Sequence, residues 1–395
     1  MTLDLERLRA ETPGCAHRIH FNNAGAGLMP RSVLDAMVGH LQLEAEIGGY
    51  EAAEDSADAI ADFYSATAEL INCRPDEVAF GSSATDAFSR ALSAVPFQAG
   101  DVILTTRDDY ISNQIAFLAL RKRFGVEVAH APTLVEGGVD VSEMARLMRE
   151  LSPRVVVVTH VPTNSGLVQP VEEIGRHCRE LELLYLVDAC QSVGQYPLDV
   201  AAIGCDFLSV TCRKFLRGPR GSGFLFASER ALKAGYEPLY IDMRGARWVA
   251  PGRYEPVAGA DRFEDWEFPY AAVIGSAVAI RYAVGVGIEE ISTRSRRLAV
   301  QLREGAAGID GVRVLDHGKE LCAIVTLAFE GLEADDVKRA LDDRRINHTL
   351  SYREYAHYDF AEKNVEWCLR LSPHYYNTED EVVQVLAAIE ELCRR

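Results

Sequence analysis

The sequence predicts an α/β fold, with a three-layer αβα large domain followed by a smaller α+β domain. Two observations predict this class. Apolar, β-rich runs alternate with amphipathic segments from about residue 70 to 240, which is the pattern of a sheet with helices on its faces. Most of these runs are continuously apolar, as expected of strands buried on both faces of a parallel sheet. After residue 240 the pattern changes, and this change predicts the second domain.

The first part of the chain contains seven strand candidates, at residues 76–82, 101–106, 126–132, 154–162, 184–190, 206–212 and 221–227. Helix candidates lie between them, for example at residues 142–152 and 170–182. In the second of these, Ile174, Cys178 and Leu181 recur at helical spacing.

The second part begins with residues 243–268, which are rich in Gly, Pro and Arg and predict a long ordered loop. The elements expected after it are one long helix at 275–308, strands at 311–316 and 322–330, and helices at 333–346 and 380–393. We therefore predict a large domain at residues 1–250, with an N-terminal arm of about residues 1–20. Residues 251–395 then form the small C-terminal domain, together with the interdomain loop and helix.

Composition limits the partners of the 395-residue chain. Its formal net charge of −18 disfavours nucleic acids and anionic membrane surfaces. No apolar run is long enough to span a bilayer, and the first residues lack the apolar stretch of a signal peptide, so we expect a cytoplasmic location. The nine cysteines are scattered and form no C-x-x-C pair, which predicts free thiols and no metal site.

Two strand ends carry the residues that point to chemistry. Asp188 ends the strand in LYLVDACQSVG, and Lys214 follows the strand in DFLSVTCRKFLRGPRGSG. In open α/β sheets, ligands bind outside the carboxyl ends of strands. Pyridoxal phosphate (PLP) needs a lysine amine for its aldehyde and a carboxylate for its ring nitrogen. Burial and neighbouring Arg213 would lower the pKa of the lysine. Spacing alone leaves open that Asp188 caps a helix and that Lys214 lies on the surface.

At these motifs the chain resembles a known family. VDACQSVG and SVTCRKFLRGPRGSGFL are similar to segments of the class V aminotransferases, which are fold-type I PLP enzymes. The family includes cysteine desulfurases, C–S lyases and isopenicillin-N-epimerase-like enzymes. The resemblance extends from FNNAGAGLMP, near the start, to RLSPHYYNTEDEV, near the end. It implies PLP as cofactor, Lys214 as the lysine that bonds to it, an amino acid as small-molecule substrate, and a homodimer.

The resemblance assigns the phosphate contacts. FGSSATDAF resembles the phosphate-binding turn, with Ser83, Ala84 and Thr85 at the start of a helix. Free backbone N–H groups and the helix dipole favour phosphate at such a position. Thr211 and Arg213 match two further phosphate contacts of the desulfurases, and an arginine supplies more charge than the usual histidine.

The ring contacts are also assigned by resemblance. Tyr110, in TTRDDYISNQ, takes the place of the aromatic residue that stacks on the ring. Asp188 would hold the ring nitrogen, and Gln191 would hydrogen-bond the phenolic oxygen. Thr163, in THVPTNSGLVQP, belongs to the segment that approaches this side of the ring, although adjacent Asn164 could face it instead.

Arg370 matches the family arginine that binds the substrate α-carboxylate, for which a bidentate guanidinium is well suited. Asn23, in FNNAGAG, is expected to border the same pocket. The polar-aromatic segment at 352–358 could select the substrate or form an exposed lid.

The sequence departs from the desulfurases at two places. They carry a nucleophilic cysteine shortly before the carboxylate-binding arginine, whereas this stretch lacks one, and Cys368 is expected to be packed in a strand. They also have a Gly-Thr pair where this chain has Trp266 and Glu267. LEAEIGGYEAAE, at residues 43–54, resembles the C–S lyase branch, although its Gly-Gly pair could equally cap a helix.

These departures favour a PLP-dependent lyase that cleaves the Cβ–S bond of a cysteine derivative by β-elimination. An epimerase or an aminotransferase acting on an amino acid is the alternative, because both start with the same α-proton removal. A cofactor-binding regulator is the non-enzymatic alternative, against which the intact Lys214, Asp188 and Gln191 set argues.

Overall fold

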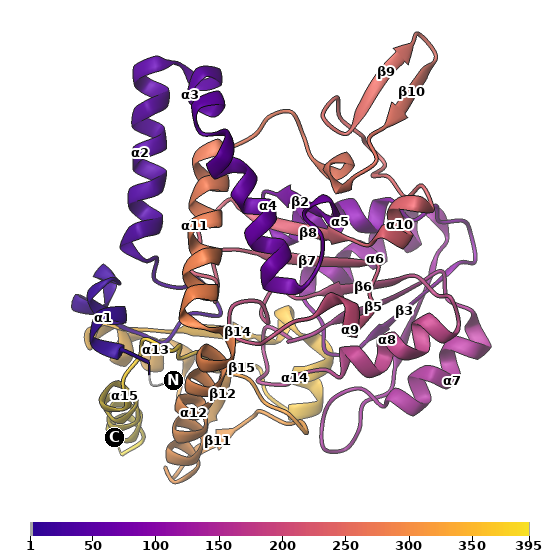
Figure 1. Ribbon diagram of the computed structural model, residues 1–395. Helices are drawn as coiled ribbons and strands as arrows, with labels where there is room; N and C mark the ends of the chain where they lie inside the picture. Colours follow the sequence, from indigo (N-terminus) through magenta and orange to yellow (C-terminus); the bar gives the residue numbers. More distant parts are fainter. Residues whose placement is uncertain (1–2, 395) are drawn as a thin grey trace.

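The computed structural model of the protein describes residues 3–394. Its centre is a seven-stranded sheet with the order β2-β8-β7-β6-β5-β3-β4 (Figure 1). The strands are β2 (Val78–Gly81), β3 (Val102–Thr106), β4 (Glu127–Ala131), β5 (Val155–Thr159), β6 (Tyr185–Asp188), β7 (Phe207–Thr211) and β8 (Gly223–Ala227). Only β8 runs antiparallel to its neighbours in this sheet. All seven predicted strands are thereby confirmed.

Helices cover both faces of this sheet. Along β5, Val155 and Val157 pack into one apolar cluster, and Val156 and Val158 pack into another. The first cluster lies under α5 (Ala84–Ser93) and α6 (Ile111–Phe124), and the second under α7 (Val141–Leu151) and α8 (Val171–Glu180). The alternation follows from the two-residue side-chain period of a strand. The predicted three-layer αβα architecture is confirmed.

A second, antiparallel sheet has the order β11-β12-β15-β14. Its strands are β11 (Val312–Val314), β12 (Val325–Phe329), β14 (Thr349–Tyr352) and β15 (Trp367–Leu371). The helices of this region are α12 (Ile288–Ala307), α13 (Ala334–Asp343), α14 (His357–Lys363) and α15 (Glu379–Cys393). This arrangement confirms the smaller α+β part, while the division at residue 250 stays a prediction. Near that boundary, α11 (Tyr270–Val286) packs against α2 (Arg31–Ile47) and α4 (Ala57–Ile71).

Two predictions for the middle of the chain are wrong. Residues 243–268 contain a hairpin, β9 (Ala246–Ala250) and β10 (Arg253–Pro256), which projects from the body in Figure 1. Its side chains are mostly exposed, so no apolar pattern marks these strands. The predicted helix at 275–308 is two helices, α11 and α12, bent by 79°. Gly287 separates them with φ +95°, a conformation that L side chains rarely adopt.

The N-terminal segment is held by backbone pairing. After α1 (Leu5–Ala10) and the 3₁₀ turn η1 (Pro13–Ala16), β1 (Ile19–His20) pairs in parallel with β13 (Ile346–Asn347). Gly48, with φ +102°, ends α2 and precedes α3 (Gly49–Asp55), so the Gly-Gly pair caps a helix. The Tyr50 side chain beside it is exposed.

The remaining elements are short: α9 (Val200–Ile203), α10 (Glu229–Lys233), η2 (Pro75–Glu77), η3 (Ala260–Phe263) and η4 (Arg353–Tyr355). Within residues 3–394, no single helix is long and apolar enough to cross a bilayer; only the bent pair α11 and α12, taken together, has the length and composition for it.

Candidate functional site

The sheet brings Asp188 and Lys214 together. Asp188 ends β6 and pairs with Ser209 of the adjacent parallel strand β7, and Lys214 lies three residues beyond the end of β7. Both side chains are buried and interact electrostatically. Burial lowers the pKa of Lys214, and the positive charge of Arg213 lowers it further. The amine is therefore biased towards its neutral, nucleophilic form.

Two hydrogen bonds fix the Asp188 carboxylate. The Asn113 side-chain amide donates to Asp188 Oδ2 at 3.0 Å, and the Cys190 backbone N–H donates to Oδ1 at 2.9 Å. Burial raises the pKa of Asp188, and these two donors oppose the rise. Asn113 also donates to Asp109 Oδ1 at 3.0 Å, so one amide bridges two buried carboxylates. This network holds Asp188 in place.

Gln191, Thr163 and Arg370 form a second group. The Gln191 amide donates to Thr163 Oγ1 at 3.3 Å and to the Ala24 carbonyl at 3.1 Å. An Arg370 N–H donates to the Thr163 carbonyl at 3.1 Å. Thr163 thus contacts both Gln191 and Arg370. The adjacent Asn164 side chain is buried.

Arg370 is a buried cation that lacks a carboxylate. Within the described part of the chain it forms no ion pair, and its Nε atom has no hydrogen-bond acceptor. Burial lowers the pKa of Arg370 to about 10, and the charge of Arg213 contributes to this effect. Tyr110 interacts electrostatically with both arginines, so the predicted stacking aromatic lies close to them. The Arg213 guanidinium itself donates to the Gly25 carbonyl.

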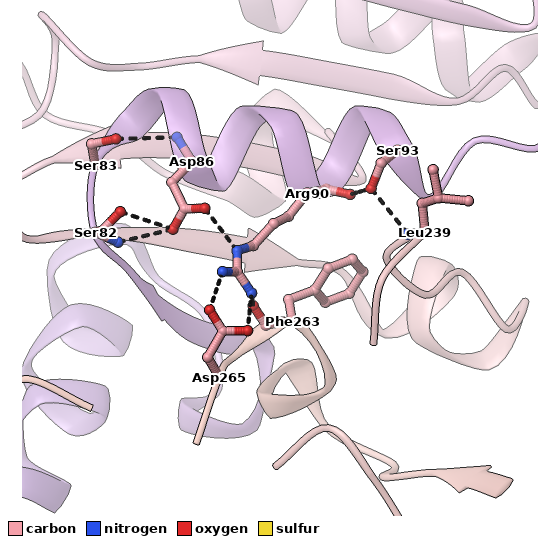
Figure 2. A network of polar contacts seen from close by, with 8 residues as sticks. All are labelled: Ser82, Ser83, Asp86, Arg90, Ser93, Leu239, Phe263 and Asp265. Atoms are coloured by element: carbon pink, nitrogen blue, oxygen red, sulfur yellow. Dashed lines mark hydrogen bonds and ion pairs between the residues drawn. The ribbon is translucent and has the colours of Figure 1, made fainter. Parts of the chain in front are cut away.

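The predicted phosphate turn is the N-terminus of α5, shown in Figure 2. Ser83 is its N-cap, and the Ser83 hydroxyl accepts from the Asp86 N–H at 3.1 Å. The backbone N–H groups of Ser83, Ala84 and Thr85 have no acceptor among residues 3–394. These are the free donors that anions bind at a helix N-terminus.

The turn lies beside the end of β7. Gly223 pairs with Thr211, and a Cβ at Gly223 would lie 3.3 Å from the Ala84 nitrogen and 2.2 Å from the Val210 carbonyl oxygen. A side chain at this position would therefore clash, which explains the glycine. Thr211 is buried here and donates to the Ser222 carbonyl at 3.3 Å.

Asn23 lies in a saturated hydrogen-bond environment. Its amide donates to the Ser372 carbonyl at 2.8 Å, and its Oδ1 atom accepts from the Tyr376 hydroxyl at 2.5 Å. These bonds join the N-terminal segment to the end of β15. The predicted contact of Asn23 with substrate stays a prediction.

Two residues at the site were missed from the sequence. Asn113 supports Asp188, and the Cys190 thiol interacts electrostatically with the Lys214 amine. Asn113 follows Asp109 by four residues at the start of a helix, a spacing that puts two polar side chains on one face. Cys190 lies two residues after Asp188, and position alone did not show that its side chain turns towards the lysine.

The geometry agrees with the comparisons to known proteins. Residues 19–385 match the family model of the class V aminotransferases. The chain belongs to this family. A probable cysteine desulfurase from Methanothermobacter thermautotrophicus is 27% identical over 98% of both chains. A probable hercynylcysteine sulfoxide lyase from Mycobacterium tuberculosis is 30% identical over 95% of this chain and 90% of its own.

A solved structure supports the fold. The apo cysteine desulfurase from Thermococcus onnurineus NA1 superposes with a TM-score of 0.90 at 25% identity, and the match covers 100% of this chain and 99% of that one. The predicted fold-type I architecture is confirmed by this agreement.

PLP, the predicted cofactor, is the cofactor of this family. The chain fits it, because three sets of polar groups at the site lack protein partners among residues 3–394. They are the backbone N–H groups of the turn that starts at Ser83, the Oε1 atom of Gln191 and the Nε atom of Arg370. Gln191 and Arg370 are buried, and buried polar groups are nearly always paired, whereas the N–H groups are the free donors of a helix N-terminus. The phosphate of PLP would accept from the N–H groups of the turn, and a substrate carboxylate would accept from Arg370 Nε.

Proposed function

We propose that this class V aminotransferase family member is a PLP-dependent lyase that cleaves the Cβ–S bond of a cysteine derivative. The observation that carries the proposal is that no cysteine occurs between Cys322 and Cys368, while the Lys214, Asp188 and Arg370 set is intact. The two relatives described above, a probable desulfurase and a probable sulfoxide lyase, both support an amino acid with a β-sulfur substituent.

Each predicted cofactor-binding residue then has a role. Ser83, Ala84, Thr85, Thr211 and Arg213 would hold the phosphate. Tyr110, Thr163, Asp188 and Gln191 would hold the ring, with Asp188 keeping its nitrogen positively charged. Bound PLP supplies an electron sink next to the substrate α-carbon.

The remaining steps belong to side chains of this protein. The Arg370 guanidinium binds the substrate α-carboxylate, which orients the Cα–H bond. The Lys214 amine, whose pKa is lowered by burial, removes the α-proton. The β-sulfur substituent leaves with its bonding electrons and is released as a thiol. Water completes the reaction, so a cysteine S-conjugate and water give the thiol, pyruvate and ammonia.

The cysteines near the site do not offer an activated thiolate. Cys368 is buried in β15, and burial raises its pKa to about 12. The prediction that it is packed is therefore confirmed. Cys190 is closer to Lys214, but burial also raises the pKa of its thiol. A reactive cysteine needs a lowered pKa, so these environments favour elimination over sulfur transfer to the protein.

The test is product analysis after PLP loading. The purified protein is incubated with cysteine, cystine, S-methylcysteine and its sulfoxide, and pyruvate, alanine and thiols are quantified. We expect one pyruvate for each sulfur product released, which is hydrogen sulfide from cysteine, cysteine persulfide from cystine, methanethiol from S-methylcysteine and methanesulfenic acid from its sulfoxide. The Lys214→Ala variant should give no pyruvate. Alanine and a protein-bound persulfide would instead identify a desulfurase. Turnover of other amino acids without pyruvate would favour the epimerase or aminotransferase.

We also propose a homodimer, and the cytoplasmic location stays a prediction. Helix α2 exposes a row of apolar side chains, Leu34, Val38 and Leu41, each 42–51% exposed. Contiguous exposed apolar surface commonly marks an interface. Light scattering at micromolar concentration should give twice the 43.5 kDa mass of the chain, and a monomer would contradict the proposal.

A further inference from the structure

A carboxylate lies on the turn that is proposed to bind phosphate. Asp86 is in the first turn of α5, and its Oδ2 atom accepts from the Ser82 backbone N–H at 3.0 Å and from the Ser82 hydroxyl at 3.2 Å. Figure 2 shows the Asp86 carboxylate pointing back towards Ser82, just before the start of the helix. An acidic residue normally stabilises a helix N-terminus. Here it lies next to the free N–H groups of Ser83, Ala84 and Thr85, where it would repel a phosphate.

Arg90 lies one helical turn further along and pairs with this carboxylate. Its Nε atom donates to Asp86 Oδ1 at 2.9 Å. The two side chains are 21% and 26% exposed, so water and salt screen the pair less than a fully exposed one. Partial burial disfavours the Arg90 cation, but the hydrogen bonds to Asp265 and Asp86 outweigh it and raise the Arg90 pKa.

The same guanidinium holds a distant segment. It donates to Asp265 through two N–H groups, one of them at 3.0 Å, and to the Phe263 carbonyl at 2.8 Å. Asp265 precedes Trp266 and Glu267, where the chain departs from the desulfurases. Two carboxylates therefore share one cation beside the turn, as Figure 2 shows. Asp265 is the more exposed partner, at 47%.

We propose that Arg90 is a positioning residue for cofactor binding, which offsets the Asp86 carboxylate so that the turn can accept a phosphate dianion. The inference rests on the proposed site, in which Ser83, Ala84 and Thr85 hold the phosphate. Arg90 touches neither the cofactor nor the substrate in this scheme. It acts through Asp86, and its pairing with Asp265 is a separate, structural contact.

The proposal predicts that the charge of Arg90 affects the affinity for PLP but not for pyridoxal. Replacing Arg90 by Gln leaves Asp86 uncompensated, and we expect the dissociation constant for PLP to rise about three- to tenfold. Affinity for pyridoxal, which has the aldehyde but no phosphate, should not change. Adding Asp86→Asn to Arg90→Gln should restore most of the PLP affinity. Arg90→Lys, which keeps the charge, should bind PLP nearly as well as the wild type.

Asp265→Asn is the matched control, because it removes the other carboxylate that Arg90 holds and leaves the Asp86 pair in place. We expect its PLP affinity to equal or exceed that of the wild type. Binding is measured by titrating apoprotein and following the visible absorbance, and thermal unfolding of each apoprotein reports any loss of structure. No catalytic assay is needed.

The outcomes separate the two levels of inference. If the wild type binds PLP no better than pyridoxal, the phosphate turn itself is wrongly assigned, and the role of Arg90 fails with it. If the wild type prefers PLP and Arg90→Gln keeps that preference, only the role of Arg90 fails. A loss in Arg90→Gln that Asp86→Asn does not restore, or an equal loss for pyridoxal, would show that Arg90 merely holds the fold.

Discussion

Asn113 is the side chain whose replacement tests the architecture of the site most directly. Its amide donates to Asp188 and to Asp109, both at 3.0 Å, and all three residues are buried. In Asn113→Ala, Asp188 loses its only side-chain donor among the described residues and keeps the Cys190 backbone donor. Asp109 still accepts from Gln114 and Thr159. The larger effect should therefore fall on Asp188.

The magnitude follows from the type of bond. A hydrogen bond to a charged group contributes about 1.5–3 kcal/mol. Its loss disfavours the ionised form of Asp188 and should raise the pKa of that carboxyl by about one to two units. Because Asp188 must be ionised to hold the ring nitrogen, the acidic limb of the pH–kcat profile should move to higher pH by the same one to two units. At pH values below this limb, kcat should be about 10–100-fold lower than that of the wild type.

The assay compares pH–kcat profiles of the wild type, Asn113→Ala and Gln114→Ala. Gln114 is the matched control, because its amide donates to Asp109 at 2.7 Å but makes no contact with Asp188. Its variant should keep the wild-type acidic limb. An Asn113→Ala enzyme with unchanged kcat and an unmoved acidic limb would refute the assignment of Asp188 as the carboxylate that must be ionised.

Three further predictions concern other buried charges. Arg370→Lys should raise KM for the amino acid about 10–100-fold with a smaller change in kcat, because one ammonium cannot replace a bidentate guanidinium; equal KM values would contradict its carboxylate role. Arg303→Ala should lower the free energy of unfolding by about 3 kcal/mol in urea titrations, since the buried Asp316 carboxylate loses its cation, which contacts it at 2.8 Å, and keeps only uncharged donors. Burial, with nearby Asp359, raises the pKa of Asp108 to about 7. Ionising this carboxyl in the folded protein therefore lowers the stability progressively as the pH rises from about 4 to 7. The Asp108→Asn variant should melt at a higher temperature than the wild type at pH 8 but not at pH 4. A difference in melting temperature that does not depend on pH would contradict this prediction.

Much of the fold could be predicted because buried strands appear in the sequence as short runs of apolar residues. Most strands of the large sheet are continuous, buried apolar runs, and each of the seven was located from its own residues. The hairpin of β9 and β10 has mostly exposed side chains, so no apolar run marks its strands in the sequence. The break at Gly287 was missed because helical segments continue on both sides of it, and the chain turns there through the positive φ of this glycine.

The sequence by itself determined which residues could do the chemistry. Lys214 and Asp188 were identified because strand ends in a parallel sheet share one edge, and the family motifs added Arg370 and the phosphate turn. Only the tertiary structure decided how these residues are supported. Asn113 donates to Asp188, which lies 75 positions away in the sequence. Arg90 pairs with Asp86 and also with Asp265, which lies 175 positions after Arg90. Such contacts depend on how side chains pack across elements, and no local pattern in the sequence records that packing.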